Sequence, residues 1–176
     1  MEIKQRGSHL DHLVRQTRMH HTQLSSMADM KANMLLTMAS VVVTLSVRYI
    51  AEPHLKWATI VLIVFCLMTI GLATYAVMPK TPFLVKRETA DITKTPGFNI
   101  LFFADFVRLS YEEFEMAMEE VMNDHSLTYQ VQIRELYTLG TFLAKKKYLF
   151  LRLAYITFII GAFASALIGL FSGVIS

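Results

Sequence analysis

Histidine and carboxylate side chains near the start of the chain are residue types that can bind a metal ion. Neutral imidazoles on one face of a helix can coordinate zinc, and the residues concerned are His9, His12, His20, His21 and Asp29. The first two histidines share a helical face, but the second pair lies further along and points in other directions. This spacing favours solvated histidines, and we expect no metal site.

Groups for nucleophilic catalysis are scarce. The chain has one cysteine, Cys66, in the middle of an apolar run, so neither an internal disulfide nor a thiolate cluster can form. The sequence contains no glycine-flanked serine and no phosphate-binding glycine loop. These residue types therefore predict a protein that is not an enzyme.

Four polar side chains recur along an apolar segment at steps of four, three and four residues, which places them on one face of a helix. They are Asn33, Thr37, Ser40 and Thr44. Inside hydrocarbon such groups need partners or water. Two interpretations stay open: hydrogen bonds between helices, each contributing about 0.6 kcal/mol, or a water-lined path through an oligomer, with this polar row lining the pore.

Small side chains recur every fourth residue near the C-terminus, at Gly161, Ser165, Gly169 and Gly173. Such a row lets two helix backbones approach closely inside a membrane. The pattern alone does not say whether the partner helix belongs to the same chain. We expect self-association, and hence a homo-oligomer.

Basic side chains form the last group with a possible ligand: Lys31, Arg108, Arg134, Lys145, Lys146, Lys147 and Arg152. We expect most of them to orient the chain in a membrane and to meet anionic lipid. Some could instead hold a phosphate-bearing ligand, for which arginine offers a bidentate fork. The candidates for ligand or gating charges are Lys31, Arg108, Arg134 and Arg152.

Long windows without charge decide which elements carry these residues. The chain has 176 residues, of which 54% are hydrophobic, and its mean hydropathy of +0.43 is too high for an ordinary soluble domain. Residues 57–78 and 153–176 lack any charge, and each window exceeds the roughly 20 residues that cross a bilayer as a helix. Residues 32–47 form a shorter charge-free window. It can cross the bilayer if the side chain of Lys31 or Arg48 at its ends stretches toward the headgroups. The alternative is a buried or re-entrant helix.

The distribution of Lys and Arg predicts the orientation. Residues 1–31 and 79–152 hold 15 of the 17 basic residues, and residues 48–56 hold the other two. By the positive-inside rule, the N-terminal and central segments are cytoplasmic and the C-terminus is external. We see no cleavable signal peptide, and the net charge of +3 gives no reason to expect a nucleic-acid partner.

The predicted architecture is an all-α membrane protein. A cytoplasmic helix in residues 1–31 continues into a first transmembrane helix (32–50), an external turn (51–56), a second transmembrane helix (57–78), a cytoplasmic helical region (79–152) and a third transmembrane helix (153–176). The N-terminal helix and the central segment together form the cytoplasmic domain.

Local signals subdivide the central segment. Prolines at its start end the second span, and residues 80–97 form a loop or a short strand. Ser110 and Glu113 have the spacing of a capping box before an acidic, amphipathic helix. Its expected apolar face is Tyr111, Phe114, Met118 and Val121. From Leu127 a second helix runs into the last span, with Gly140 as its weak point.

Three sequence motifs lie in a fixed order relative to the spans. They are Ala28-Asp29-x-Lys31-Ala32-x-x-Leu35-Leu36; then Asn99-Ile100-Leu101-Phe102-Phe103 with Leu109-Ser110-x-Glu112-Glu113-Phe114; and then Leu139-Gly140 with Lys147-Tyr148-x-x-x-Arg152-x-Ala154-Tyr155. Together they resemble the transmembrane effectors of Pycsar bacterial antiphage systems. The resemblance covers roughly residues 25–170.

This resemblance implies a function in immunity, carried out in the bacterial inner membrane. A partner enzyme, a pyrimidine nucleotide cyclase, makes cyclic CMP or cyclic UMP on infection, and the effector responds by impairing membrane integrity, which causes abortive infection. The sequence has no separate cyclic-nucleotide-binding domain with a β-roll, so the response is indirect or the ligand binds the helical cytoplasmic part. The alternative function is a constitutive membrane scaffold or regulatory subunit that binds a cytoplasmic protein.

Overall fold

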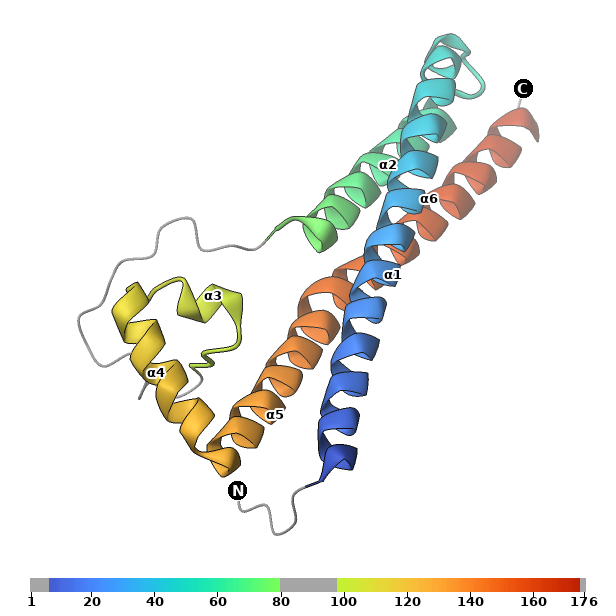
Figure 1. The fold of residues 1–176 in the computed structure, drawn as a ribbon. Coiled ribbons are helices and arrows are strands. Elements are labelled where there is room, and N and C mark those ends of the chain that lie inside the picture. The colour runs from blue at the N-terminus through green and yellow to red at the C-terminus, as the bar shows by residue number, and fades with distance from the viewer. Residues whose placement is uncertain (1–6, 80–97, 175–176) are drawn as a thin grey trace. The chain divides into compact units, whose positions relative to one another are not determined.

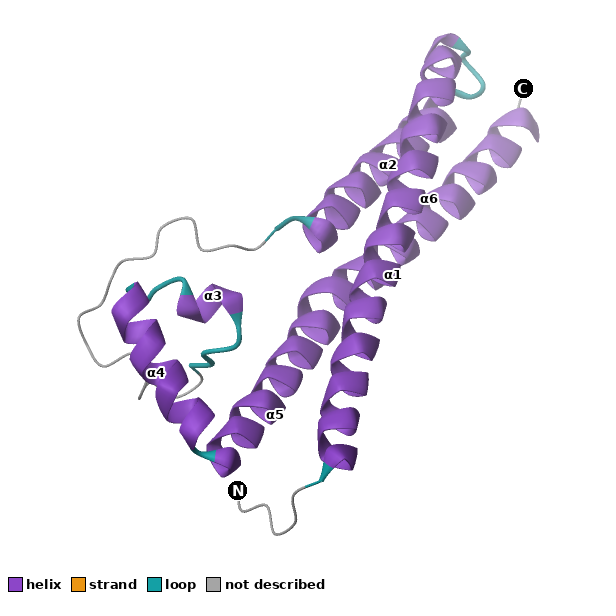
Figure 2. Cartoon of the chain, viewed as in Figure 1, coloured by secondary structure: helices purple, strands orange, loops and turns teal. Residues whose placement is uncertain are grey.

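The computed structural model describes residues 7–79 and 98–174, without the side chains of residues 104, 173 and 174, and all regular structure in these ranges is helical (Figures 1 and 2). The elements are α1 (Ser8–Ser46), the 3₁₀ turn η1 (Val47–Ala51), α2 (Lys56–Val77), α3 (Phe103–Phe106), α4 (Tyr111–Asn123), α5 (His125–Phe142), the π-helical turn η3 (Leu143–Tyr148) and α6 (Leu149–Val174). The predicted all-α fold is confirmed. The loop or strand expected over residues 80–97 lies outside the described residues.

Three helical segments are long and apolar enough to cross a membrane: Ser8–Ala51, Lys56–Val77 and His125–Ser172. The prediction of three helices able to span a membrane is therefore confirmed. The first and third are continuous helices of 44 and 48 residues, well beyond the roughly 20 that a bilayer requires. Each therefore has a polar part outside the hydrocarbon, as expected for helices that enter the membrane without a break.

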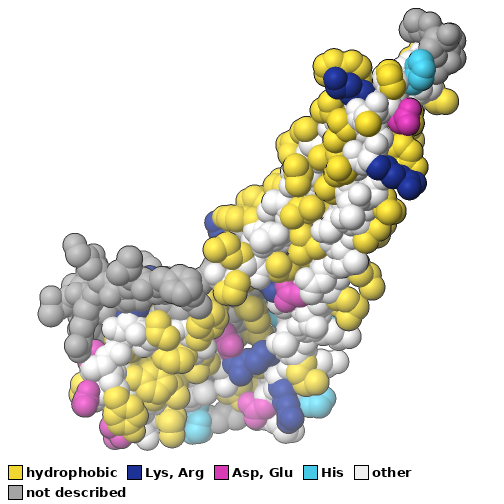
Figure 3. Space-filling model, turned by 90° about the horizontal axis from the view of Figure 1, so that it is seen from above, with side chains coloured by type: hydrophobic (Ala, Val, Ile, Leu, Met, Phe, Trp, Pro, Cys, Tyr) yellow, Lys and Arg dark blue, Asp and Glu magenta, His cyan; other side chains and the backbone are white. Residues whose placement is uncertain are grey.

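The chain divides into two compact units. The first unit holds Met1–Thr22 and Pro79–Thr141, and the membrane unit holds Gln23–Met78 and Phe142–Ser176. Large apolar side chains cover much of the visible outer surface of the membrane unit (Figure 3). Trp57, Phe163 and Leu170 are each more than 65% exposed. In water such a surface would be unfavourable, whereas lipid chains cover it without cost.

Small residues hold one half of the membrane unit together. Ala28 and Ala32 of α1 are buried against Ala76 of α2 and Leu151 of α6, and Leu35 follows one turn later against Ala73 and Ala154. Alanine lets the three backbones approach closely, which maximises dispersion contacts where no water can supply a hydrophobic driving force. The buried face of α1 therefore points at α2 and α6.

Helices α2 and α6 pack along the rest of their length. A Cβ atom built on Gly161 would overlap the side chain of Phe65, with Cγ only 2.7 Å away. Further along, a Cβ on Gly169 would lie 3.7 Å from Cβ of Ala58. The Ser172 hydroxyl donates to the carbonyl oxygen of His54 at 2.7 Å, which joins the end of α6 to the turn before α2.

Side chains from distant parts of the sequence also meet in the first unit. The hydroxyl of Tyr129 donates to Oδ1 of Asp11 at 2.6 Å, and Arg18 forms an ion pair with Glu135. Both contacts join the start of α1 to α5. Gly140 lies in regular helix beneath the imidazole of His21, which is 3.3 Å from where a Cβ would stand; the departure from α geometry comes at Leu143 instead.

Helix α4 begins at the predicted capping box. The Ser110 amide donates to Glu113 Oε2 at 2.7 Å, and the Glu113 amide donates to Ser110 Oγ at 3.3 Å. Phe114 packs against Phe106, with ring centroids 5.3 Å apart. The predicted apolar face is wrong at one position, because Tyr111 is 71% exposed. It is the first residue of the helix and precedes the turn that packs.

Candidate functional site

The polar row of the first span lies on the outer face of α1. Asn33, Thr37, Ser40 and Thr44 are all exposed, on the side opposite the buried residues Ala28, Ala32, Leu35 and Ala39. Because the buried row already contacts α2 and α6, the polar row does not face the other spans of the same chain. It would face lipid or another molecule.

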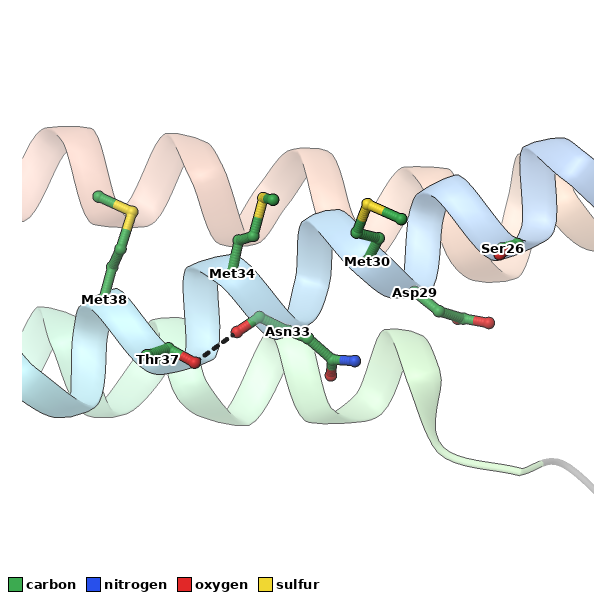
Figure 4. A pocket seen from close by; sticks show the side chains of 7 residues that line it. All are labelled: Ser26, Asp29, Met30, Asn33, Met34, Thr37 and Met38. Atoms are coloured by element: carbon green, nitrogen blue, oxygen red, sulfur yellow. Dashed lines mark hydrogen bonds between the residues drawn. The ribbon is translucent and has the colours of Figure 1, made fainter.

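An open groove of about 770 Å³ follows this outer face. The residues that line it are Ser26, Asp29, Met30, Asn33, Met34, Thr37 and Met38. Figure 4 shows two rows of side chains: a polar row along Asp29, Asn33 and Thr37, and a methionine row along the same stretch of helix. Rows of residues four apart form the ridges against which a neighbouring helix packs.

Hydrogen bonds within the polar row divide its members into two kinds. The Thr37 hydroxyl donates to the carbonyl oxygen of Asn33 at 3.0 Å, and that of Thr44 donates to the carbonyl oxygen of Ser40 at 2.9 Å. The threonines thus satisfy their donors on their own helix. For the carboxamide of Asn33, the described part of the chain offers no partner. The Asn33 carboxamide thus differs from the two threonine hydroxyls, which bond to their own helix.

A partly buried lysine joins α1 to the turn before α6. Nζ of Lys147 donates to Oδ1 and Oδ2 of Asp29 at 2.7 and 2.8 Å and to Oγ of Ser25 at 2.8 Å. The lysine side chain is only 14% exposed, whereas that of Asp29 is 41% exposed. All three ammonium donors can be used in this arrangement, so the charge is well compensated despite its burial.

Two tyrosines extend the contact between these helices. The hydroxyl of Tyr148 donates to the carbonyl oxygen of Leu24 at 3.0 Å, and that of Tyr155 donates to the carbonyl oxygen of Lys31 at 3.3 Å. Lys147 and Tyr148 are consecutive, yet both contact α1. They belong to the π-helical turn η3, whose wider geometry changes the direction of side chains relative to a regular α-helix. Single π-turns inside α-helices are frequent at functional positions.

The four candidate ligand or gating charges divide between the units. Lys31 and Arg152 are exposed residues of the membrane unit, and Arg108 and Arg134 are exposed residues of the first unit. Arg134 donates through Nη1 to the carbonyl oxygen of Phe98 at 3.0 Å. A common ligand site formed by all four stays a prediction.

Asn99, the residue after Phe98, is buried at 1% exposure and is one that sequence reasoning did not select. Its side-chain Oδ1 accepts from the backbone amide of Leu101 at 3.0 Å. Its backbone amide donates to Oδ2 of Asp105, also at 3.0 Å. Its Nδ2 is buried with no partner among the described residues. Asn99 is the first residue of the second sequence motif, and this position is the signal that could have singled it out.

The row of small residues on α6 packs against α2 of the same chain. Gly161 and Gly169 face α2, at Phe65 and Ala58, and Ser165 between them is half-buried. The surroundings of Gly173 lie outside the described residues. Close packing within one chain accounts for the two described glycines, so the predicted self-association needs a different face.

The histidines do not gather into a metal site in the described part of the chain, where no three His, Cys, Asp or Glu residues come together. Asp29, considered above as a metal ligand, binds Lys147 instead. Sequence reasoning had assigned Lys147 to membrane orientation. The signal that could have paired them is that both belong to motifs at the ends of spans.

Comparison with known proteins adds one finding. The sequence model of the Pycsar effector protein domain, PycTM, matches residues 12–174. No curated protein and no solved structure matches the chain. The match includes all three spans and both units. The chain is therefore a membrane protein that belongs to the PycTM family, the effectors of a cyclic-nucleotide antiphage defence system.

Proposed function

We propose that this protein is a bacterial inner-membrane effector that impairs membrane integrity when cyclic CMP or cyclic UMP is present, and so causes abortive infection. A pyrimidine nucleotide cyclase would be its functional partner. The observation that carries the proposal is the family match over residues 12–174, together with three helices able to span a bilayer. The effector needs no catalysis, because disturbance of the bilayer is itself the output.

The orientation in the proposal places the N-terminus and the segment between the second and third spans in the cytoplasm, and the C-terminus outside. The uneven distribution of Lys and Arg supports it, with none after Arg152. In this orientation the first unit is exposed to nucleotides made inside the cell. The exposed Lys145 and Lys146 would lie at the inner leaflet, where they meet anionic lipid.

Two exposed arginines and one unpaired hydrogen-bond donor support a ligand site in the first unit. Arg108 and Arg134 are exposed, and guanidinium groups bind phosphate in a bidentate manner. Arg134 is anchored beside Asn99, whose Nδ2 is buried and unpartnered. A pyrimidine base offers carbonyl oxygens that such an amide can bind. Lys31 and Arg152, which border the spans, would then act as gating charges.

The ligand must bind the active arrangement more tightly than the resting one. To move an equilibrium from 1:99 to 99:1 requires about 5.5 kcal/mol of differential binding. Several subunits of a homo-oligomer could share this requirement, because each bound nucleotide adds its own preference. This is the energetic reason to include a homo-oligomer in the proposal.

Liposomes loaded with a fluorescent dye test the proposal. Reconstituted protein should release dye on addition of cyclic CMP or cyclic UMP, but not with cyclic AMP. An Arg108→Gln variant should need more nucleotide for the same release, and Lys145→Gln, which changes an exposed lysine outside the proposed site, is the matched control. Neither leakage nor a change in thermal stability with either nucleotide would contradict the proposal and favour a constitutive scaffold.

A further inference from the structure

The three-helix core of the membrane unit ends close to η3. Ala28 of α1, Ala76 of α2 and Leu151 of α6 are buried together in one layer, and α2 ends one residue after Ala76. At this end of the core, α1 is held by hydrogen bonds that Lys147 and Tyr148 of η3 donate to it. We name these two residues and their acceptors on α1 the η3 clasp: Lys147, Tyr148, Leu24, Ser25 and Asp29.

The η3 clasp lies where the chain passes between the two units. The division falls after Thr22 on α1 and after Thr141 on the helix that leads into η3. Leu24 follows the first of these points by two residues, and Leu143, the first residue of η3, follows the second by two. A displacement that a ligand causes in the first unit, if it passes along either helix, therefore reaches the clasp before it reaches the spans.

The geometry of η3 is imposed by its tertiary contacts. Its sequence is rich in alanine and lysine, which favour the regular α-helix, and π-turns are rare by comparison. The wide turn is held because Leu143 is 4% exposed and because Lys147 and Tyr148 are bonded to α1. Once those bonds break, the local preference of the sequence favours a return to α geometry. A short segment with two competing arrangements is the kind of element that a switch requires.

We propose that the η3 clasp holds the spans in their resting arrangement, and that its Lys147 to Asp29 ion pair opens when the effector is active. The proposal rests on the proposed function, because it names the contact through which a ligand in the first unit would act on the bilayer. Asp29 is the partner that can leave the ion pair, since it is 41% exposed and water can replace the ammonium group. Lys147 is 14% exposed, so it favours the closed clasp for as long as the carboxylate is present.

Dye release without nucleotide tests the clasp. Asp29→Asn should raise basal release from liposomes about fivefold or more, the lower end of the usual coupling between sites. It should also lower the concentration of cyclic CMP or cyclic UMP that gives half-maximal release, because less differential binding is then needed.

Gly161→Ala is the matched control for lost stability. It disturbs the same unit at the contact with Phe65, away from the clasp, so it should lower the melting temperature in detergent without raising basal release. Basal release that stays unchanged in Asp29→Asn, or that rises equally in Gly161→Ala, would overturn the proposal.

A double variant separates a gating contact from a purely structural one. Asp29→Asn combined with Lys147→Met removes both charges, which should recover part of the melting temperature but cannot restore the ion pair. A gating contact predicts that basal release stays high in the double variant. Basal release that falls back in step with the melting temperature would reject the gating role. Lys145→Met, at an exposed lysine of the same turn, should behave like the unchanged chain in both measurements.

The clasp and the proposed function fail in different ways. Raised basal release in Asp29→Asn, in a protein whose unchanged form ignores cyclic CMP and cyclic UMP, would support the clasp and contradict activation by nucleotide. Nucleotide-dependent release from the unchanged protein, with basal and half-maximal values that Asp29→Asn does not alter, would support the effector and contradict the clasp.

Discussion

At the scale of single residues, three glycines in the spans differ in what surrounds them. Gly161 stands where any side chain would overlap Phe65, Gly169 has room for a methyl group beside Ala58, and Gly71 has no neighbour within 4 Å of its would-be Cβ. All three are helical, so each pays the same loss of helix propensity relative to alanine. Only at Gly161 does packing require glycine.

Gly161→Ala should therefore destabilise the protein by about 1–3 kcal/mol, the usual cost of overpacking a tight contact. The near atoms, Cβ and Cγ of Phe65, lie close to the backbone of α2 and cannot swing away. The measurement is reversible unfolding in mixed micelles. Gly71→Ala is the matched control and should be neutral or slightly stabilising; an equal loss in both variants would show that the Phe65 contact does not limit the position.

The Asp29 to Lys147 pair gives a second prediction at this scale. Asp29→Asn removes the anion from a lysine that is 14% exposed, and we expect a loss of about 1–3 kcal/mol, because hydrogen bonds to a charged group are broken. Adding Lys147→Met should recover part of that loss, since the buried charge goes with it. Lys145→Met, at an exposed lysine of the same turn, is the control. Additive losses in the double variant would argue against the pair.

At the scale of elements, caps and turns decide where helices begin. Helix α4 starts at Ser110, which exchanges hydrogen bonds with Glu113, and α5 starts after Asp124, whose Oδ1 accepts from the Ser126 amide at 2.8 Å. Each cap satisfies amide donors that the first helical turn leaves free. The break between α4 and α5 is therefore fixed by side chains.

Ser110→Ala should weaken α4 by about 1 kcal/mol, the usual value of an N-terminal cap. Amide hydrogen exchange is the suitable measurement, because it reports the opening of one helix: the amides of the first turn, from Glu112 to Phe114, should exchange faster. Amides of α2 should keep their rates. If the first turn of α4 exchanged no faster, the capping box would contribute nothing to that helix.

At the scale of the whole molecule, orientation in the membrane is the property on which the proposed mechanism depends. A chain with three spans must have its termini on opposite sides. The excess of basic residues before the first span and between the second and third predicts that the N-terminus is inside.

Reporter fusions check this orientation. Green fluorescent protein folds only in the cytoplasm and alkaline phosphatase only outside it, so the former should be active at the N-terminus and the latter at the C-terminus. Replacing the three lysines at 145–147 by glutamine should weaken the bias, because positive charge next to a span carries most of the signal. Activity of one reporter at both ends would contradict three spans.

The sequence by itself determined the number and order of the helices able to span a membrane, the long continuous helices and the α4 cap. Each of these depends on local quantities: the length of a charge-free window, helical periodicity, or a hydroxyl three residues before a carboxylate. The resemblance through three motifs, confirmed by the family match over residues 12–174, also needed only the order of residues along the chain.

Only the tertiary structure decided which faces of the helices meet. Asn33 and Ala32 are neighbours in sequence, yet one is exposed and the other is fully buried, and no local rule says which face of a membrane helix contacts its neighbours. The same holds for Gly161 against Phe65 and for Lys147 against Asp29. Such pairings depend on how three helices rotate to place their smallest residues in contact, and that rotation is a property of the assembled bundle rather than of any one segment.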